Sequence, residues 1–559
     1  MYRIQKNNTP IPLRGERKKS KFNRENLLIP LYSAFQHPPL GDGGIELMSP
    51  NSLTIQHLLT RNARYRPWHT AFVFGETRFS FKELNDSVNQ LCNALVTAGI
   101  GKGDKVATLL SNSIALYEVY WACAKMGAVA VPLSPLLRGQ GLLNLLDNSD
   151  TLLVITCSGL SVYVDEIKDN LKNIPAGNYW VIDEAKCEGY KNYHQQTKLQ
   201  PSISPVTEIV EGNDAYNIMY TSGTTGLPKG IVINHEVRAL YCSLFANAFR
   251  MKPESVVMHS GGIIFNGSFL TLMPAMYLGC TYILQDHFDA RQVIETIKSE
   301  NVTHTILVPS QIIACLQQED FNKQNLPSLE YILSVGAPLL HGQKEALNEK
   351  LPGVFYELYG LTEGFMTVLD RTESKRKIGS VGVPLPFMDM KIVDDKGNEL
   401  PVGSIGEIIG TGPLLMTEYY KNLVQTAEAI RNGWLYTGDL GYMDEEGFLF
   451  LTGRKKDLII SGGVNVYPVD IEEILILHPM IKDVAVFGVP HKEWGETPVA
   501  CVVLKEGGSA TAADILTWAN NNLEARYQKV YEVCIVDELP RNVAGKVLKK
   551  DLREKYNPG

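Results

Sequence analysis

Short apolar runs alternate with helical patterns through much of the chain, and this alternation limits the folds open to it. Strands are expected at residues 105–110, 128–132, 302–308 and 331–335. Helices are expected at residues 114–126 and 289–300, the second with Asp289 as its N-cap. This order predicts an α/β fold with parallel sheets covered by helices, in which ligands bind beyond the carboxyl ends of the strands.

The pattern changes near Gly453, where a charged segment (residues 454–457) follows an expected strand end at 447–451. Beyond this segment, helices are expected at 469–477 and 512–521, and strands at 484–489 and 498–504. A chain of 559 residues is too long for one ordinary domain. We therefore expect an N-terminal extension (1–48), a large domain (49–455) and a small α+β domain (456–559).

The formal net charge of −8 argues against nucleic acid as the main partner, because phosphate binding needs a basic face. The N-terminus is a local exception, with basic residues at Arg3, Lys6, Arg14, Arg17, Lys18, Lys19, Lys21 and Arg24. It is interpreted either as a solvated tail or as a peripheral contact with an anionic membrane surface. No apolar segment follows it, so it does not resemble a secretory signal.

Nine cysteines are scattered without any CxxC pair, which is typical of reduced thiols and favours a cytoplasmic location. Residues 260–285 contain no charged side chain and are long enough to span a bilayer. Polar residues, Pro274 and Gly279 interrupt this stretch, so we expect a loop, a buried helix and a buried strand, with no transmembrane segment.

The most distinctive motif is the loop YTSGTTGLPKG at residues 220–230, which follows an apolar strand at 216–220. Glycines and small hydroxyl residues let backbone N–H groups turn toward an anion, and Lys229 adds positive charge. These features predict a phosphate-binding loop. It is not a Walker A loop, because Pro228 and Gly230 do not fit that pattern.

Taken with further motifs, this loop resembles the adenylate-forming superfamily of acyl-CoA synthetases, peptide-synthetase adenylation domains and luciferases. The matching stretches follow the superfamily's order: GAPL at 336–339, YGLTE at 359–363, YTGD at 436–439, GRKKD at 453–457 with SGGVNVYP at 461–468, and PRNVAGK at 540–546. The resemblance covers residues 50–555 and favours the AMP-forming acyl-CoA synthetase branch. It implies ATP, Mg²⁺ and CoA as cofactors or substrates, and a small domain that rotates between two half-reactions.

The resemblance assigns an ATP-binding role to residues in each of these stretches. They are Thr221, Ser222, Gly223, Thr224, Thr225, Gly226, Lys229, Gly336, Ala337, Pro338, Glu357, Tyr359, Gly360, Thr362, Asp439, Arg454 and Lys546. Glu363 can supply a hard oxygen ligand to Mg²⁺, with Thr224 as the second expected ligand. Asp439 can accept hydrogen bonds from ribose hydroxyls, and Arg454 offers a fork of donors. The less favoured alternatives are a surface carboxylate for Glu363, a turn residue for Asp439 and a surface ion pair for Arg454.

The implied catalytic residues are Lys546, Glu363, Thr221 and Lys229, which would stabilise charge on the phosphoryl transition state. Lys456 resembles the hinge residue of the superfamily. Gly462 and Gly463 would line the pantetheine tunnel, where a ligand runs against backbone. The alternative for the two glycines is a plain hairpin turn.

The acid pocket departs from the superfamily pattern, because the histidine expected after the strand near Val256 is replaced by Ile264. The residues carried to the pocket by position are Phe265, Asn266, Gln311, Ser334, Gly336, Gly360 and Phe365. None is an aspartate that could pair with an ammonium group, and a buried unpaired charge is costly. The pocket therefore favours a fatty, alicyclic or aryl acid over an amino acid.

The sequence thus predicts an AMP-forming acid–CoA ligase whose partners are a carboxylic acid, ATP and CoA. One alternative is an adenylating enzyme that loads the pantetheine of a carrier protein. Another is a non-catalytic nucleotide-binding protein on the same fold. The oligomeric state is open, with a homodimer as one alternative.

Overall fold

Two sheets of mostly parallel strands form the first three-quarters of the computed structural model, as the strand–helix alternation predicts. The structure describes residues 52–556 apart from 185–186, 206, 222–228, 506, 524 and 542–546. The first sheet has the order β16-β15-β14-β13-β12-β10-β11-β1-β2. Its strands are β1 (Thr70–Phe74), β2 (Thr77–Ser80), β10 (Val256–His259), β11 (Thr281–Leu284), β12 (His304–Leu307), β13 (Tyr331–Ser334), β14 (Phe355–Gly360), β15 (Met366–Leu369) and β16 (Val383–Pro384).

The second sheet has the order β19-β9-β8-β4-β3-β5-β6-β7. Its strands are β3 (Lys105–Leu109), β4 (Val129–Leu133), β5 (Thr151–Thr156), β6 (Tyr179–Val181), β7 (Lys191–Asn192), β8 (Ala215–Thr221), β9 (Lys229–Asn234) and β19 (Glu418–Tyr419). Strands β8 and β9 form an antiparallel hairpin at this end of an otherwise parallel run. The expected phosphate loop is therefore the connection of that hairpin.

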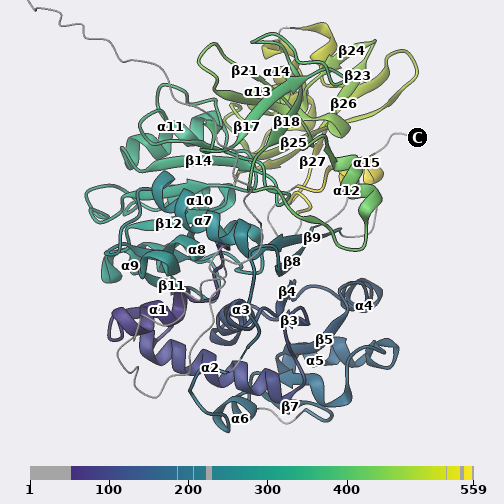
Figure 1. Ribbon diagram of the computed structural model, residues 1–559. Helices are drawn as coiled ribbons and strands as arrows, with labels where there is room; N and C mark the ends of the chain where they lie inside the picture. The colour runs from purple at the N-terminus through teal and green to yellow at the C-terminus, as the bar shows by residue number, and fades with distance from the viewer. Residues whose placement is uncertain are drawn as a thin grey trace, which may run out of the picture. The chain divides into compact units, whose positions relative to one another are not determined.

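Helices cover both sheets (Figure 1). Their bounds are α1 (Leu58–Tyr65), α2 (Phe81–Thr97), α3 (Ile114–Met126), α4 (Gly139–Asn148), α5 (Ser158–Asp165), α6 (Tyr193–Lys198), α7 (His235–Ala248), α8 (Phe269–Leu278), α9 (Ala290–Glu300), α10 (Pro309–Leu316) and α11 (His341–Lys350). Side chains of α2, α3, α7 and α8 share one apolar core with strands of both sheets. Helices α9, α10 and α11 pack on the other face of the first sheet, and α4 and α5 pack on the other face of the second.

Local capping fixes where these helices begin and end. The Ser113 side chain accepts a hydrogen bond from Leu116 N at the start of α3, and the helix ends at Gly127, which has a left-handed φ of +70°. Asp289 caps α9 by accepting from Gln292 N at 2.8 Å, as the sequence predicts. The expected strand at 302–308 is shorter than predicted, with β12 formed by His304–Leu307.

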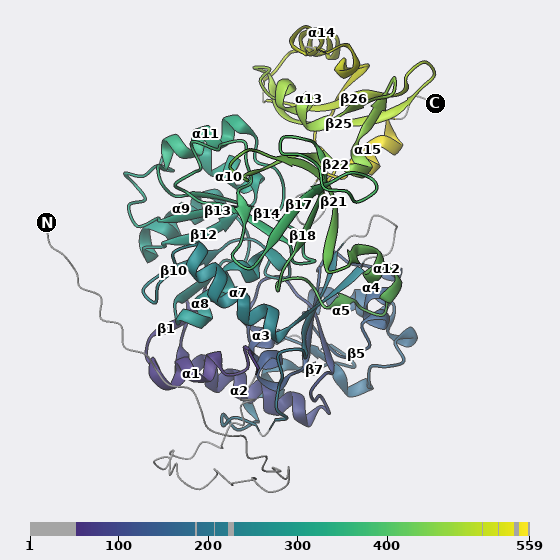
Figure 2. The ribbon, with the colours of Figure 1, turned by 45° about the horizontal axis from the view of Figure 1, so that its top comes forward.

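A third sheet is antiparallel, and the expectation of parallel-rich sheets did not include it. Its strands are β17 (Asp389–Val393), β18 (Gly406–Thr411), β20 (Ile430–Arg431), β21 (Trp434–Met443) and β22 (Leu449–Arg454), with α12 (Leu423–Ala429) preceding β20 (Figure 2). Strands β21 and β22 are joined by the short segment 444–448, and a connection this short can join only antiparallel neighbours. Strands β17 and β18 are also antiparallel and are joined by the longer segment 394–405. Residues 436–439 and 453–454 of the expected nucleotide motifs lie on β21 and β22.

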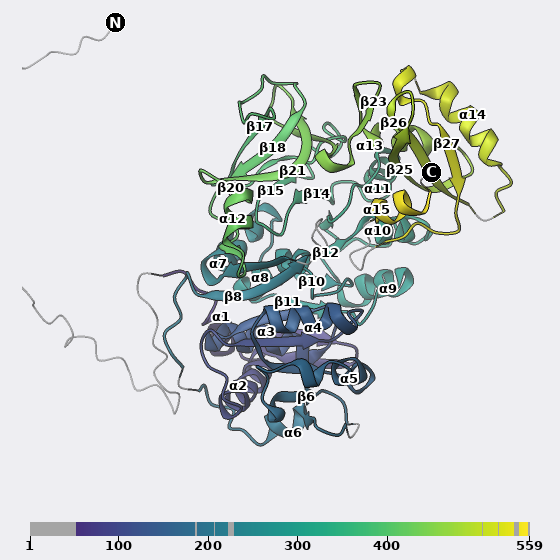
Figure 3. The same cartoon turned by 90° about the vertical axis from the view of Figure 1, so that its right-hand side faces the viewer.

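The fourth sheet uses only strands that follow Lys456 (Figure 3). Its elements are β23 (Ile459–Ser461), β24 (Val464–Val466), α13 (Pro468–Leu475), β25 (Ile481–His491), β26 (Gly495–Leu504), α14 (Ala512–Asn522), β27 (Glu532–Ile535) and α15 (Lys549–Lys555). Two apolar clusters drawn entirely from residues 459–552 pack against it. The expected boundary at residue 456 falls in the 3₁₀ turn Lys455–Asp457, between β22 and β23.

Residues 260–285 form the expected loop, buried helix α8 and strand β11. In the described part of the chain, every helix is too short or too polar to cross a membrane. All nine cysteines are free, and six of them are buried.

Candidate active site

The predicted site residues of the first sheet follow the carboxyl ends of four neighbouring parallel strands. Strands β10, β12, β13 and β14 lie side by side and run in the same direction. The residues that follow or end them are Phe265 and Asn266 after β10, Gln311 after β12, Gly336, Ala337 and Pro338 after β13, and Gly360, Thr362 and Glu363 at and after β14. The fold therefore places the expected nucleotide and acid residues along one sheet edge, as parallel α/β sheets do.

The expected phosphate loop is anchored by the pair of Thr221 and Lys229, which face each other as the last pair of the β8–β9 hairpin. Residues 222–228 between them, which include Ser222, Gly223, Thr224, Thr225 and Gly226, lie outside the described residues. Tyr220, which precedes Thr221 on β8, donates a 2.6 Å hydrogen bond to Asn148 Oδ1 of α4. The two anchors are thus held on a paired and buttressed hairpin.

A tyrosine links two predicted catalytic residues from separate segments. The Lys229 ammonium nitrogen lies 4.6 Å from the centre of the Tyr419 ring, and the Tyr419 hydroxyl donates a 2.8 Å hydrogen bond to Glu363 Oε1. Tyr419 is on the short strand β19, which pairs with β9. Burial, followed by the Glu363 charge, raises the pKa of Tyr419, so the hydroxyl stays a donor. Sequence reasoning missed Tyr419; its only signal is an aromatic pair after an apolar run.

The tip that carries Thr362 and Glu363 is a tight turn between β14 and β15. Leu361 N donates to Phe365 O at 3.2 Å, and Gly364 N donates to Leu361 O at 3.0 Å. Gly364 has φ of +113°, and a Cβ there would lie 1.9 Å from Leu414 O. Only glycine fits this position, and Met416 N holds the neighbouring Glu363 carbonyl at 2.8 Å.

The Asp439 carboxylate is contacted by two residues from other motifs, Tyr359 and Arg454. Asp439 is 6% exposed; its Oδ2 accepts a 2.8 Å hydrogen bond from Tyr359, and its Oδ1 lies 2.9 Å from Arg454 Nε. Asp439 and Arg454 are also cross-strand partners of β21 and β22. Burial, followed by the Asp439 charge, raises the pKa of Tyr359. Asp439 is thus a strand residue and part of a charged cluster.

The loop after β13 adopts a conformation that needs glycine. Gly336 has φ of +95°, and the preceding Ser334 is fully buried, with an Oγ that has no hydrogen-bond partner among the described residues. Ser334 pairs in register with Glu357 of β14. Glu357 is buried against Lys344 of α11, whose Nζ lies 2.5 Å from Glu357 Oε2. The buried pair connects β14 to α11, the helix that follows the loop, so Glu357 is a buried ion-pair residue next to the expected adenine loop.

The expected acid-pocket residues do not all come together. Phe265 and Asn266 are half-buried. The Gln311 side chain instead caps the start of α10, where its Oε1 accepts a hydrogen bond from Val308 N. A Cβ on Gly267 would lie 3.9 Å from Val335 Cγ1, so the loop after β10 lies near the loop after β13. Phe365 is fully buried in the core of the third sheet with Met390, Ile408 and others. It packs there and does not join this group.

His259 lies at the end of β10, next to the expected pocket. Burial lowers its pKa to about 4, so the imidazole is neutral near pH 7. Its Nε2 side faces Gly261, where a Cβ would approach to 3.2 Å. His259 therefore brings no positive charge to this end of β10.

The expected pantetheine residues form the turn of the β23–β24 hairpin. Gly462 and Gly463 both have positive φ, +59° and +79°, which is the geometry of a two-residue type I′ turn. Gly462 N donates to Trp494 O at 2.7 Å, and a Cβ on Gly462 would meet the Trp494 ring at 2.9 Å. A Cβ on Gly463 would meet nothing within 4 Å. Gly463 therefore presents open backbone, while Gly462 packs on tryptophan.

Two further residues complete the set. Lys456 is exposed in the 3₁₀ turn, and its neighbour Lys455 forms ion pairs with Asp395 and Glu407 at 2.8 and 3.1 Å. Lys546 lies outside the described residues.

The residues around Glu363 suit a magnesium ion that is bound mainly by the nucleotide better than one enclosed by protein ligands. Among the described residues, no three His, Cys, Asp or Glu side chains are grouped to hold a metal ion. Mg²⁺ is commonly held by one or two carboxylates together with substrate phosphates. Glu363 beside the phosphate hairpin is a donor of that kind.

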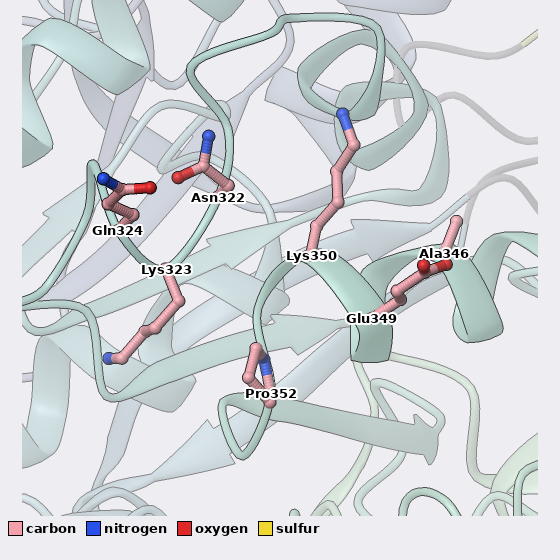
Figure 4. A pocket seen from close by; sticks show the side chains of 7 residues that line it. All are labelled: Asn322, Lys323, Gln324, Ala346, Glu349, Lys350 and Pro352. Carbon is pink, nitrogen blue, oxygen red and sulfur yellow. The ribbon is translucent and has the colours of Figure 1, made fainter.

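A surface hollow of about 550 Å³ is lined by Asn322, Lys323, Gln324, Ala346, Glu349, Lys350 and Pro352 (Figure 4). Its two lysines already donate to backbone carbonyls, Lys323 to Pro327 and Leu329, and Lys350 to Leu316 and Gln318. None of the predicted site residues lines it.

Comparison with known proteins identifies the relatives of the chain. It matches the AMP-binding enzyme family over residues 59–420 and the AMP-binding enzyme C-terminal domain over residues 470–546. It is 31% identical over 512 residues to the indoleacetate–CoA ligase of Aromatoleum aromaticum, covering 90% of this chain and 98% of that protein. It is 32% identical over 507 residues to the long-chain-fatty-acid–CoA ligase FadD13 of Mycobacterium tuberculosis, covering 89% and 98%. The solved structure of ATP-bound MatB from Rhodopseudomonas palustris has a TM-score of 0.83 at 28% identity, covering 90% and 99%.

Proposed function

The chain belongs to the AMP-binding enzyme family, and from this premise we propose which of its residues perform each step of the reaction. It is an ATP-dependent, AMP-forming acid–CoA ligase. The single observation that carries the residue assignment is the convergence of Lys229, Tyr419 and Glu363 at the hairpin beside the sheet edge.

In the first half-reaction, a carboxylate oxygen of the acid attacks the α-phosphorus of ATP and pyrophosphate leaves. Lys229 and the loop that begins at Thr221 neutralise charge on the phosphates, and Lys546 does so at the in-line transition state. Glu363 and Thr224 would hold the magnesium ion, which would neutralise charge on the phosphates and the pyrophosphate leaving group. Tyr419 keeps the Glu363 carboxylate in place by its hydrogen bond.

Asp439 and Arg454 bind the ribose in this scheme. The Asp439 carboxylate is already oriented by Tyr359 and Arg454, and each oxygen keeps a second lone pair for a ribose hydroxyl. Gly336, Ala337 and Pro338 face the adenine from the loop after β13, and Glu357 with Lys344 stiffens that loop. Gly360 and Thr362 approach the α-phosphate side from the end of β14.

In the second half-reaction, the thiolate of CoA attacks the acyl carbon of the adenylate, and the C–O bond to AMP breaks. The small domain turns about Lys456, and the pantetheine arm passes over Gly463, where no side chain stands in the way. The adenylate is already an activated acyl group, so the chain needs no nucleophile of its own.

The acid enters beside Phe265, Asn266 and Gln311. These side chains are neutral, so an ammonium group would lack a partner there. This lining supports an organic acid with a fatty, alicyclic or aryl skeleton over an amino acid.

The experiment for the residue assignment separates the two half-reactions in the Lys546→Ala variant. Loss of one preorganised charge should slow acid-dependent ATP–pyrophosphate exchange by about 100-fold or more. Conversion of supplied acyl-AMP and CoA to acyl-CoA should stay within a few-fold of the parent, since the small domain has turned by then. Equal losses in both half-reactions would contradict the domain rotation, and near-parental exchange would remove Lys546 from the adenylation step.

A carrier-protein pantetheine is the alternative thiol acceptor. The two are separated by giving the enzyme an acid that supports exchange, ATP, and either free CoA or a pantetheinylated carrier protein. Thioester formation on CoA supports our proposal, and transfer to the carrier alone would replace it.

A further inference from the structure

A buried arginine beside the expected acid pocket has no partner of opposite charge among the described residues. Arg238 lies in the first turn of α7, after the Asn234 N-cap, and its side chain is fully buried. Burial lowers its pKa, yet a guanidinium stays protonated at any pH at which proteins fold. The structure therefore holds a permanent positive charge inside the domain.

The neighbours of Arg238 are neutral. Its Nε and Nη2 donate to Asn217 Oδ1 at 3.3 and 3.2 Å, and Nη2 also donates to Asn266 Oδ1 at 2.9 Å. The guanidinium carbon lies 4.0 Å from the centre of the Phe269 ring and 4.9 Å from that of Tyr241. Two amide oxygens and two ring faces thus share the charge.

The remaining terminal nitrogen has nothing to bind. Nη1 of Arg238 is buried and has no hydrogen-bond partner, and none of the carboxylates in the described part of the chain forms an ion pair with this arginine. Asn217 Nδ2, in the same cluster, also has no hydrogen-bond partner within the described ranges. A buried charge is normally paired, because an uncompensated one destabilises the fold by several kcal/mol.

The position of Asn266 connects this charge to substrate. Asn266 follows the carboxyl end of β10 and is one of the half-buried residues expected to line the acid pocket. Its amide oxygen is the one that Arg238 Nη2 contacts. An anion that enters beside Asn266 can replace this amide on the guanidinium fork, which matches a carboxylate with two parallel N–H donors.

We propose that Arg238 selects the acid substrate by pairing with a second acidic group, so that the preferred acids are dicarboxylic acids. One carboxylate is adenylated and the distal one binds the guanidinium. This inference rests on the proposed acid–CoA ligase function and narrows its substrate. It keeps the aliphatic or aryl skeleton of the acid and adds an anionic end.

The first experiment measures acid-dependent ATP–pyrophosphate exchange with matched pairs of acids. Straight-chain dicarboxylic acids from malonate to sebacate are each compared with the monocarboxylic acid of equal carbon number, and the benzenedicarboxylates with benzoate. The best diacid should exceed its matched monoacid in kcat/KM by about 100-fold or more, because a monoacid leaves the buried donor unpaired. A best monoacid equal to or better than every diacid overturns the inference.

The second experiment asks whether Arg238 is the cause. Arg238→Met removes the charge but keeps an unbranched side chain, and should reduce the diacid-to-monoacid ratio to near unity. The control is Arg250→Met, the next arginine along the chain, which pairs with Asp370 and is partly exposed. It should leave the ratio as in the parent.

A third variant protects the test against misfolding. Asn266→Asp places a carboxylate on the atom that now sits 2.9 Å from Nη2, so it pairs with Arg238 internally. The melting temperature should rise or hold while the diacid preference disappears. Retention of the preference in this folded variant would contradict the pairing.

The outcomes also separate this inference from the proposed function. If no acid of either kind supports exchange, the adenylation function itself fails. If monoacids support exchange and Arg238→Met leaves the ratios unchanged, the ligase function stands and Arg238 is a structural link between α7, β8 and the loop after β10.

Discussion

The Tyr419 hydroxyl holds Glu363 Oε1 at 2.8 Å while the same ring lies 4.6 Å from the Lys229 ammonium nitrogen. Tyr419 thereby contacts both Lys229, which is expected to bind the phosphates, through its ring, and Glu363, which is expected to bind magnesium, through its hydroxyl. Strand β19 carries Tyr419 on the edge of the second sheet, and Glu363 sits at the end of the first. Tyr419 thus couples the two sheets at the candidate site.

Tyr419→Phe tests this link, because it keeps the ring and removes only the hydrogen bond. Without this hydrogen bond, the activation free energy of adenylation should rise by about 1–1.5 kcal/mol, which slows adenylation about tenfold. The apparent Mg²⁺ requirement should rise more than the KM of the acid. The measurement is ATP–pyrophosphate exchange as a function of Mg²⁺ concentration.

The adjacent Tyr420→Phe variant is a matched control. Its hydroxyl donates to Asp150 Oδ2 at 2.9 Å, away from the carboxylate in question. Near-parental exchange is expected for this variant. A similar loss of exchange activity in both variants would mean that the phenylalanine substitutions slow the reaction by destabilising the fold.

Asp439→Ala should weaken ATP binding by about 1–3 kcal/mol, since buried ribose hydroxyls would lose a charged acceptor and Arg454 would lose its partner. Tyr359→Phe removes one of the two groups that orient Asp439 and should have a smaller effect in the same direction. Calorimetric titration with ATP measures both. An unchanged affinity in a folded Asp439→Ala protein would exclude it from the ribose site.

Gly463→Leu should abolish acyl-CoA formation while acyl-AMP formation survives. The reason is steric, because a side chain would occupy the open backbone over which pantetheine is proposed to pass. Product analysis of each half-reaction with purified protein provides the measurement.

Backbone strain is the competing explanation, since φ at Gly463 is +79°. Gly507→Leu carries the same strain in the same domain, at φ of +76° with nothing within 4 Å of a Cβ. This control should keep both half-reactions. If Gly463→Leu still forms acyl-CoA at the parental rate, the hairpin is only a turn.

Stability should fall as the pH is lowered from about 6.5 to 4. Burial lowers the pKa of His235, His259 and His304 to about 4 each. The unfolded chain then binds protons that the folded chain does not, so protonation favours unfolding below the unfolded pKa. Each histidine can contribute up to about 2–3 kcal/mol to this loss. Denaturant unfolding at several pH values measures the slope.

His235→Leu isolates one contribution, because neither ring nitrogen of this buried histidine has a hydrogen-bond partner in the part of the chain that the structure describes. The variant should match the parent near pH 7 and unfold less readily than the parent at pH 5. An unchanged pH slope would show that His235 is not protonated on unfolding in this range.

Much of the large domain could be predicted from sequence because its signals are local. Helix α3 begins and ends where the pattern places it, and Asp289 caps α9 as expected. The antiparallel third sheet was missed, since β17 is joined to β18, and β21 to β22, by polar segments without a helix between them. Its role in presenting Asp439 and Arg454 became visible only from the pairing of β21 with β22.

The candidate site divides in the same way. Glycine-rich motifs mark Gly336, Gly364 and the 462–463 turn, because positive φ or a close backbone approach demands glycine there. Tyr419, Lys344 and Arg238 carry no motif; each matters through a partner far away in sequence. Phe365 illustrates the converse, since its position beside Glu363 suggests a pocket, whereas its ring packs into the core of the third sheet.

The central claim is that the acid is activated as an acyl-adenylate, and transfer of an oxygen label tests it most directly. An accepted acid labelled with ¹⁸O in its carboxylate is incubated with the enzyme, ATP, Mg²⁺ and CoA, and the nucleotide product is examined by mass spectrometry. If the carboxylate attacks the α-phosphorus and the thiolate then breaks the C–O bond, one labelled oxygen must remain on AMP. The account predicts singly labelled AMP in an amount equal to acyl-CoA. Unlabelled AMP, or ADP with labelled phosphate, would contradict it.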